Sequence, residues 1–304
     1  MTDERMHADE LAIDGELVRS LLTEQLPRWA DLPLSRVRSA GTENALFRLG
    51  DELVVRLPRH ASAEGPIDNE FRWLPRLAPA LPLAIPEPLA LGEPAAGYPW
   101  RWSVYRWIEG EAVDARVTGD PHGFAETLAR FVVALQSIDT SDGPPPGDHN
   151  GWRGEALGRR DAEFREALAA CDGIEGIDVA TIASVWDEAL GEPGWGGDPV
   201  WVHGDLLPTN LLTSQDRLGA VLDFGSLGVG EPTCDVMAAW TTVAPEARPA
   251  YRAVLGLDEA TWARGRGWAL SWAVIALPYY LETNPTFVTL ARRTIDAVLT
   301  DPDR

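Results

Sequence analysis

The chain has 304 residues, enough for one large domain or for two lobes with a buried core. Its net charge of −21 and isoelectric point near 4.5 argue against nucleic acid and anionic membranes as partners, because like charges repel. An acidic surface favours a cationic substrate, but it fits simple solubility or adaptation to salt equally well.

All 26 basic residues are arginine, and lysine is absent. Chemistry that needs a Schiff-base lysine is therefore excluded, and phosphate has to be bound by arginine, backbone N–H groups or a metal. We expect no secretory signal, because the acidic N-terminus precedes no apolar stretch, and no apolar run has the length of a membrane span. The two cysteines, Cys171 and Cys234, form no redox or ligand motif, so a cytoplasmic protein is expected.

The first hundred residues predict a small sheet with flanking helices. Apolar residues alternate between turn signals in the strand candidates and follow a helical spacing in the others. The expected elements are a helix over residues 14–26, strands at Val37–Ala40, Ala45–Leu49 and Leu53–Leu57, a helix over 66–78, and a strand pair around Leu89–Leu91 and Trp102–Trp107.

After Gly110 the pattern becomes helical. Asp120 and Pro121 suit the N-cap and first turn of a helix with apolar residues at i, i+3, i+4 and i+7. Further helices are expected over residues 159–170, 178–190, 233–243, 246–255, 259–281 and 286–299. The chain therefore predicts an α+β fold of two lobes: a small antiparallel sheet lobe over residues 1–107 and a larger, mainly helical lobe over residues 108–304.

A polar motif, HGDLLPTN, follows the short strand expected at Val200–Val202. Its Asp205 and Asn210 lie in a loop, because Pro208 argues against a long helix. The chain then turns and returns as the apolar run Leu218–Leu222. This hairpin is expected to bring the next residue, an aspartate, back beside Asn210.

That aspartate, Asp223, completes a set of three oxygen-bearing side chains. Asn210 and Asp223 offer hard oxygen ligands that suit Mg²⁺ bound to phosphates. Asp205 is placed to accept a proton from a hydroxyl, and one base with two metal ligands is what phosphoryl transfer needs. A transition-metal site around His203 and Asp205 lacks a third His or Cys ligand at a useful spacing, and a hydrolase would need a G-x-S-x-G elbow, which is absent.

HGDLLPTNLL together with VLDFG resembles the catalytic and metal loops of the aminoglycoside phosphotransferase family, a branch of the protein-kinase-like fold. The resemblance extends over residues 35–300 and is strongest over residues 203–240. It implies that the lobe over residues 1–107 binds nucleotide and that the lobe over residues 108–304 carries the catalytic loop and the acceptor-binding helices.

The resemblance also implies roles for single residues. Asp205 would be the catalytic base or would orient the hydroxyl, and Asn210 and Asp223 would bind Mg²⁺. His203 would brace the catalytic loop, and Asp235 would support that loop from the start of a helix.

The resemblance also implies the residues that bind the nucleotide, and one of them, Arg56, departs from the family pattern. Arg56 and Glu70 stand where the family pairs a strand lysine with a helix glutamate, so the phosphate has to approach differently. Thr42 lies in the loop expected to meet phosphate, although a plain hairpin turn has the same pattern. The backbone near Tyr105 and Trp107 would meet the base of ATP or GTP, and both rings also suit an ordinary core.

The resemblance implies a Mg²⁺-dependent kinase that transfers the γ-phosphate of ATP or GTP to a hydroxyl of a small molecule. The first expectation is an antibiotic: an aminoglycoside or another sugar-bearing antibiotic such as a nucleoside, macrolide or cyclic peptide antibiotic. A metabolic kinase for a sugar or an amino alcohol stays open. A pseudokinase that only binds nucleotide stays open as well, although the intact polar motif speaks against it. We expect a monomer or a dimer with no nucleic acid or membrane partner.

Overall fold

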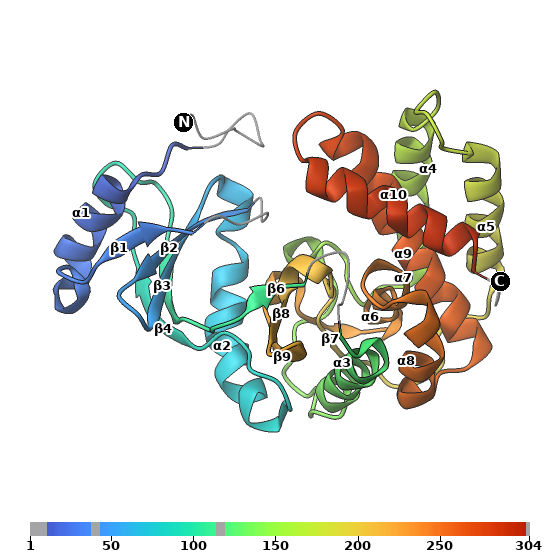
Figure 1. Cartoon of the computed structure of the whole chain (residues 1–304), viewed down its shortest axis with the longest axis horizontal. Coiled ribbons are helices and arrows are strands. Elements are labelled where there is room, and N and C mark those ends of the chain that lie inside the picture. The colour runs from blue at the N-terminus through green and yellow to red at the C-terminus, as the bar shows by residue number, and fades with distance from the viewer. Residues whose placement is uncertain (1–10, 38–42, 114–118, 302–304) are drawn as a thin grey trace. The chain divides into compact units, whose positions relative to one another are not determined.

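The structure is a computed structural model that describes residues 11–37, 43–113 and 119–301 (Figure 1). The chain divides into two compact units, residues 1–79 with 84–110, and residues 80–83 with 111–304. Among the residues described, no helix combines the length and the apolar character that crossing a membrane requires.

The smaller unit is built on a five-stranded antiparallel sheet with the strand order β1-β2-β3-β5-β4. Its strands are β1 (Leu34–Arg36), β2 (Asn44–Leu49), β3 (Leu53–Pro58), β4 (Pro88–Gly92) and β5 (Trp102–Arg106), and its helices are α1 (Gly15–Gln25) and α2 (Pro66–Leu77). These elements confirm the small sheet with its helices.

The first strand differs from the prediction of Val37–Ala40. Strand β1 begins earlier because β2 offers pairing partners as far as Leu49, which lies opposite Leu34. The backbone N–H of Val37 still donates to Leu46 at 2.9 Å. The remainder of the predicted strand falls within residues 38–42, outside the described part of the chain.

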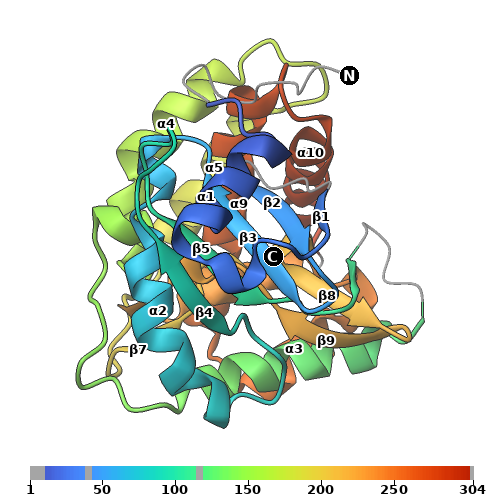
Figure 2. The same ribbon diagram turned by 90° about the vertical axis from the view of Figure 1, so that its left-hand side faces the viewer.

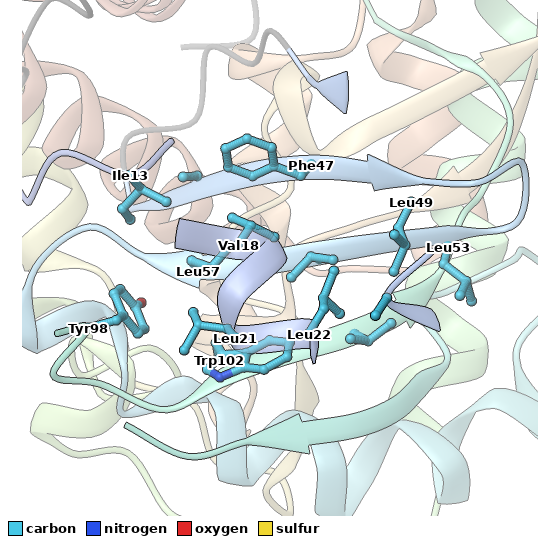
Figure 3. Packing of buried hydrophobic residues seen from close by; sticks show 14 residues of the cluster. Ile13, Val18, Leu21, Leu22, Phe47, Leu49, Leu53, Leu57, Tyr98 and Trp102 are labelled. Carbon is cyan, nitrogen blue, oxygen red and sulfur yellow. The ribbon is translucent and has the colours of Figure 1, made fainter. Parts of the chain in front are cut away.

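Alternation along β3 assigns its side chains to the two faces of the sheet. Val55 and Leu57 lie on the face that α1 covers, and Figure 3 shows Leu21 and Leu22 of α1 packed among the side chains of this face. In Figure 2, α1 lies across the same sheet. Arg56, between Val55 and Leu57, therefore projects from the opposite face.

The larger unit is mainly helical. Its helices are α3 (Pro121–Gln136), α4 (Asp161–Ala170), α5 (Val179–Gly191), α6 (Thr233–Val236), α7 (Ala238–Thr241), α8 (Arg248–Leu255), α9 (Glu259–Tyr280) and α10 (Pro285–Leu299). Helix α9 packs against α4, α5, α6 and α10 and is buried around most of its circumference, as expected of a central helix. The predicted helices are confirmed, except that 233–243 is divided into α6 and α7.

Two small sheets complete the larger unit. One is the three-stranded sheet β6-β8-β9, and the other is the antiparallel pair β10-β7. Their strands are β6 (Glu111–Ala112), β7 (Val200–Val202), β8 (Leu211–Ser214), β9 (Arg217–Val221) and β10 (Gly228–Gly230). Strand β7 and the β8–β9 hairpin follow the prediction, whereas β6 has only two residues and β10 has two glycines among its three, so neither shows an apolar alternation.

Candidate active site

The hairpin β8–β9 brings the two halves of the polar motif together, as the sequence predicts. Leu211 pairs with Val221, and the backbone N–H of Leu222 donates to the carbonyl of Asn210 at 2.7 Å. Asp223 therefore follows directly on the residue that is bonded to Asn210.

Asn210 and Asp205 are joined by their side chains. The amide Nδ2 of Asn210 donates to Oδ2 of Asp205 at 2.8 Å and to the Asp205 carbonyl at 2.9 Å. Because the nitrogen is engaged with Asp205, the side-chain oxygen of Asn210 is the atom suited to bind a cation.

Asp205 has the electrostatic environment of a proton acceptor. Burial and the nearby charge of Asp223 raise the pKa of the Asp205 carboxyl to about 7, while Arg153 and the hydrogen bond from Asn210 act in the opposite direction. A carboxylate with a raised pKa is a stronger base than one in water.

Asp223 adopts a left-handed backbone conformation, with φ 59° and ψ 74°. Aspartate tolerates this region better than most side chains, because its short carboxylate can bond locally. Here the carboxylate accepts from the N–H of Gly225 at 3.4 Å. The turn directs the chain away from the hairpin immediately after the carboxylate.

His203 is fully buried and links the loop over residues 203–210, which the resemblance identifies as the catalytic loop, to the end of β9. Its Nδ1 accepts from the N–H of Asp205 at 3.2 Å, and its Nε2 lies 3.0 Å from the carbonyl of Leu222. This pattern requires a neutral imidazole with the proton on Nε2. Burial lowers the pKa of His203 to about 4, which keeps the ring neutral.

Asp235, in α6, holds the same loop from another side. Its Oδ2 accepts from the N–H of His203 at 2.8 Å, and its Oδ1 accepts from the N–H of Gly204 at 2.7 Å. Burial raises the pKa of Asp235 to about 6, against the effect of these two hydrogen bonds.

Gly204 is required by its surroundings. Its φ is +81°, and an added Cβ would lie 2.8 Å from Cγ of Arg153 and 2.9 Å from the carbonyl oxygen of Ser226. Arg153 was not among the residues predicted from the sequence, because no motif surrounds it. Only the fold of its loop brings it to the catalytic loop.

In the smaller unit, Arg56 and Glu70 form an ion pair in which one guanidinium nitrogen contacts both carboxylate oxygens. Nη1 of Arg56 lies 2.9 Å from each carboxylate oxygen of Glu70, whose side chain has no exposed surface. The hydroxyl of Tyr105 donates to the same carboxylate, and burial raises the pKa of Tyr105 well above its usual value. Tyr105 therefore directs its side chain to the ion pair.

Asn44 is a second partner of Arg56 that the sequence did not reveal. With its amide oxygen directed at the guanidinium, Asn44 accepts from Nε and Nη2 of Arg56 at 3.1 Å each. The two residues come from neighbouring strands, and this contact depends on the register of β2 against β3.

Two further residues were expected at the nucleotide, Trp107 and Thr42. The backbone N–H of Trp107 donates to the carbonyl of Glu52 at 2.7 Å, and its ring lies 4.4 Å from the guanidinium of Arg48. Thr42 lies outside the described residues, so its expected role is not addressed by the structure.

The family model of the phosphotransferase enzyme family matches residues 35–268. The chain belongs to this family. It is therefore a phosphotransferase, and its two-unit α+β fold is the kinase-like fold predicted above.

Solved structures agree with the fold. Aminoglycoside 2′-phosphotransferase-IIIa in complex with GDP has a TM-score of 0.74 and 17% identity, over 94% of this chain and 99% of that chain. The macrolide 2′-phosphotransferase MphH from Brachybacterium faecium has a TM-score of 0.62 and 20% identity, over 95% and 99%. ADP-bound aminoglycoside phosphotransferase APH(2″)-Ib has a TM-score of 0.60 and 17% identity, over 94% and 97%. No curated protein matches the chain by sequence.

The polar groups of this phosphotransferase fit a magnesium ion. Asn210 and Asp223 provide an amide oxygen and a carboxylate, which are hard ligands. Among the described residues, no group of three or more His, Cys, Asp or Glu side chains is placed to hold a metal by itself. The remaining ligands would have to come from phosphate oxygens and water, which is the usual manner of binding Mg²⁺.

Proposed function

We propose that this phosphotransferase transfers the γ-phosphoryl group of ATP or GTP to a hydroxyl group of a small molecule. The observation that carries the proposal is the joined pair of Asp205 and Asn210, with Asp223 returned to it by the hairpin. A base next to two cation ligands is what phosphoryl transfer requires.

In this proposal Asp205 accepts the hydrogen bond of the acceptor hydroxyl and takes its proton. Asn210 holds the Asp205 carboxylate through its amide nitrogen, and the side-chain oxygens of Asn210 and Asp223 would hold Mg²⁺. When bound, Mg²⁺ neutralises charge on the phosphates. His203 and Asp235 keep the loop in place.

For the nucleotide, we propose that Arg56 binds the phosphates and that Glu70 and Tyr105 hold its guanidinium in one orientation. An arginine keeps its charge at every physiological pH and offers several N–H donors to phosphate. Thr42 would add a hydroxyl to the phosphates, and the segment at Trp107 would lie against the base.

For the acceptor, we propose a sugar-bearing antibiotic, with aminoglycosides and macrolides first. The support is the likeness to an aminoglycoside and a macrolide phosphotransferase, together with the net charge of −21, which favours a cationic acceptor. Such an enzyme would act in the cytoplasm, where its nucleotide is available, and would confer resistance.

The biochemical test is the release of ADP or GDP by purified protein, with ATP and GTP compared across a panel of acceptors. The proposal predicts turnover that rises with one class of acceptor and disappears in EDTA. Nucleotide binding without turnover for any acceptor would favour a pseudokinase.

The cellular test is expression in a sensitive bacterium, with the inhibitory concentration measured for aminoglycosides, macrolides, nucleoside and cyclic peptide antibiotics. An Asp205→Asn variant expressed at the same level is the control. A raised inhibitory concentration for the wild type alone supports resistance. Unchanged susceptibility to every class, with turnover of a sugar or amino alcohol in vitro, would point to a metabolic kinase.

A further inference from the structure

The loop that precedes α4 is built to hold one arginine, Arg153, against the catalytic loop. Within it, the buried side chain of Asn150 accepts from the N–H of Gly147 at 3.0 Å and donates to the carbonyl of Arg153 at 3.0 Å. A single side chain thus determines the conformation of the residues leading to Arg153.

The backbone on both sides of Arg153 is constrained. Gly151, Trp152 and Gly154 have φ values of 58°, 60° and 88°. A positive φ strains the backbone of a bulky residue such as Trp152, whereas glycine adopts it freely. The carbonyl of Gly154 accepts from the N–H of Glu231 at 2.6 Å. An unusual conformation that the surroundings maintain is more often found at functional sites than in ordinary loops.

The guanidinium of Arg153 spans from its own loop to the catalytic loop. Its Nε donates to the carbonyl of Gly204 at 3.0 Å, and its Nη1 donates to the carbonyl of Gly151 at 3.0 Å. The ring of Trp268 in α9 lies 5.7 Å away. The absence of a side chain at Gly204 is what allows this approach.

Arg153 also places a positive charge near Asp235, the buried aspartate that holds the catalytic loop. Its charge opposes the rise in the pKa of Asp235. Arg153 thus combines a hydrogen bond to the residue before Asp205 with a favourable charge for the aspartate that supports the same loop.

We propose that Arg153 is a positioning residue for phosphotransfer: it holds the Gly204 carbonyl, and with it the backbone that presents Asp205 to the acceptor hydroxyl. The proposal rests on the proposed function. A displacement of the base by about 1 Å is enough to lower kcat on the order of 100-fold. Arg153 is therefore expected to affect kcat and not nucleotide binding.

The kinetic test compares Arg153→Met and Arg153→Lys with Arg159→Met. Arg159 is the matched control, because it stacks on Trp152 at 4.2 Å and, within the described part of the chain, makes no hydrogen bond or ion pair to residues 203–210. We expect Arg153→Met to lose about 100-fold in kcat with the KM for nucleotide within about twofold. Added guanidinium should restore part of the activity, Arg153→Lys should retain part of it, and Arg159→Met should match the wild type.

A second readout separates this inference from the proposed function. Hydrogen exchange in the peptide covering residues 203–210 should accelerate in Arg153→Met and not in Arg159→Met, whatever the enzyme phosphorylates. Absence of turnover in the wild type with every acceptor would overturn the proposed function. Unchanged exchange, or an unchanged kcat in Arg153→Met, would overturn the role of Arg153.

Discussion

At the scale of single residues, the ion pair with Glu70 constrains the orientation of the Arg56 guanidinium. The side chain of Glu70 has no exposed surface and that of Arg56 has 14%, so both charges have lost most of their hydration. Such a pair is tolerated only when each charge has partners, which here are the Tyr105 hydroxyl and the Asn44 amide. The pair therefore orients Arg56 more than it adds to stability.

A double-mutant cycle tests this interpretation. Arg56→Met should lower the free energy of unfolding by about 3–5 kcal/mol, because it leaves the buried Glu70 charge without its counter-ion. Arg56→Met with Glu70→Gln should recover part of that loss, yet neither variant should bind nucleotide tightly. Urea unfolding gives the stability, and calorimetric titration with nucleotide gives the affinity.

The control for that cycle is the exposed pair Arg106–Glu87, with a separation of 2.6 Å and side chains 48% and 56% exposed. Arg106→Met should leave the free energy of unfolding nearly unchanged, because water screens an exposed pair. Equal stability of Arg56→Met and the double variant would contradict the account of Arg56.

At the scale of secondary-structure elements, strand β9 and helix α6 hold the catalytic loop through hydrogen bonds. His203 bonds it to the end of β9, and Asp235 bonds it to α6. Both attachments are hydrogen bonds within the protein that the buried side chains of His203 and Asp235 make. In the proposed function, such a fixed loop would lower the cost of reaching the transition state.

Asp235→Asn should weaken the attachment to α6. An amide can accept only one of the two N–H bonds, and its NH₂ would face the other donor. We expect the free energy of unfolding to fall by about 1–3 kcal/mol and kcat to fall with it. The exposed Asp216, in the turn of the β8–β9 hairpin, provides the control variant Asp216→Asn, which should behave as the wild type.

His203 predicts a dependence of stability on pH. Its pKa is about 4 in the folded protein and 6.5 in the unfolded chain, so the unfolded chain binds the proton first as the pH falls. The contribution of His203 to the free energy of unfolding is fully present above pH 6.5. It is lost as the pH falls toward 4, by on the order of 3 kcal/mol.

The raised pKa of Asp235 changes the stability in the opposite direction as the pH falls. The effect of His203 is therefore measured as the difference in unfolding free energy between two proteins that both contain Asp235. The unfolding free energies of the wild type and His203→Gln should converge as the pH falls from 6.5 to 4. Parallel curves for the two proteins would show that His203 is not buried as a neutral ring.

The elements also show why only part of the site was predictable. Asn210 and Asp223 were brought together as expected, because the hairpin between them forms by local pairing, and the Asn210 amide joins Asp205 to them. Strand β10 was missed because two of its three residues are glycine. Arg153 and Asn44 were missed because their contacts depend on loop conformation and strand register, which leave no periodic signal in the sequence.

At the scale of the whole molecule, the net charge of −21 opposes the binding of an anionic triphosphate. It also destabilises the compact state through repulsion among like charges. We expect the melting temperature to rise when KCl is increased within the range where the Debye length falls from about 10 Å to about 3 Å. A melting temperature that falls over this range would show that attractive ion pairs outweigh the repulsion.

In the proposed mechanism, Asp205 acts as the base beside a magnesium ion that Asn210 and Asp223 would hold. The most direct test of this claim is the acceptor-dependent turnover of nucleotide by the wild type and Asp205→Asn, each with Mg²⁺ and with EDTA. We predict that the wild type requires Mg²⁺ and that Asp205→Asn loses about 10²- to 10⁴-fold in kcat while binding nucleotide as before. Full activity of Asp205→Asn, or undiminished turnover in EDTA, would contradict the claim.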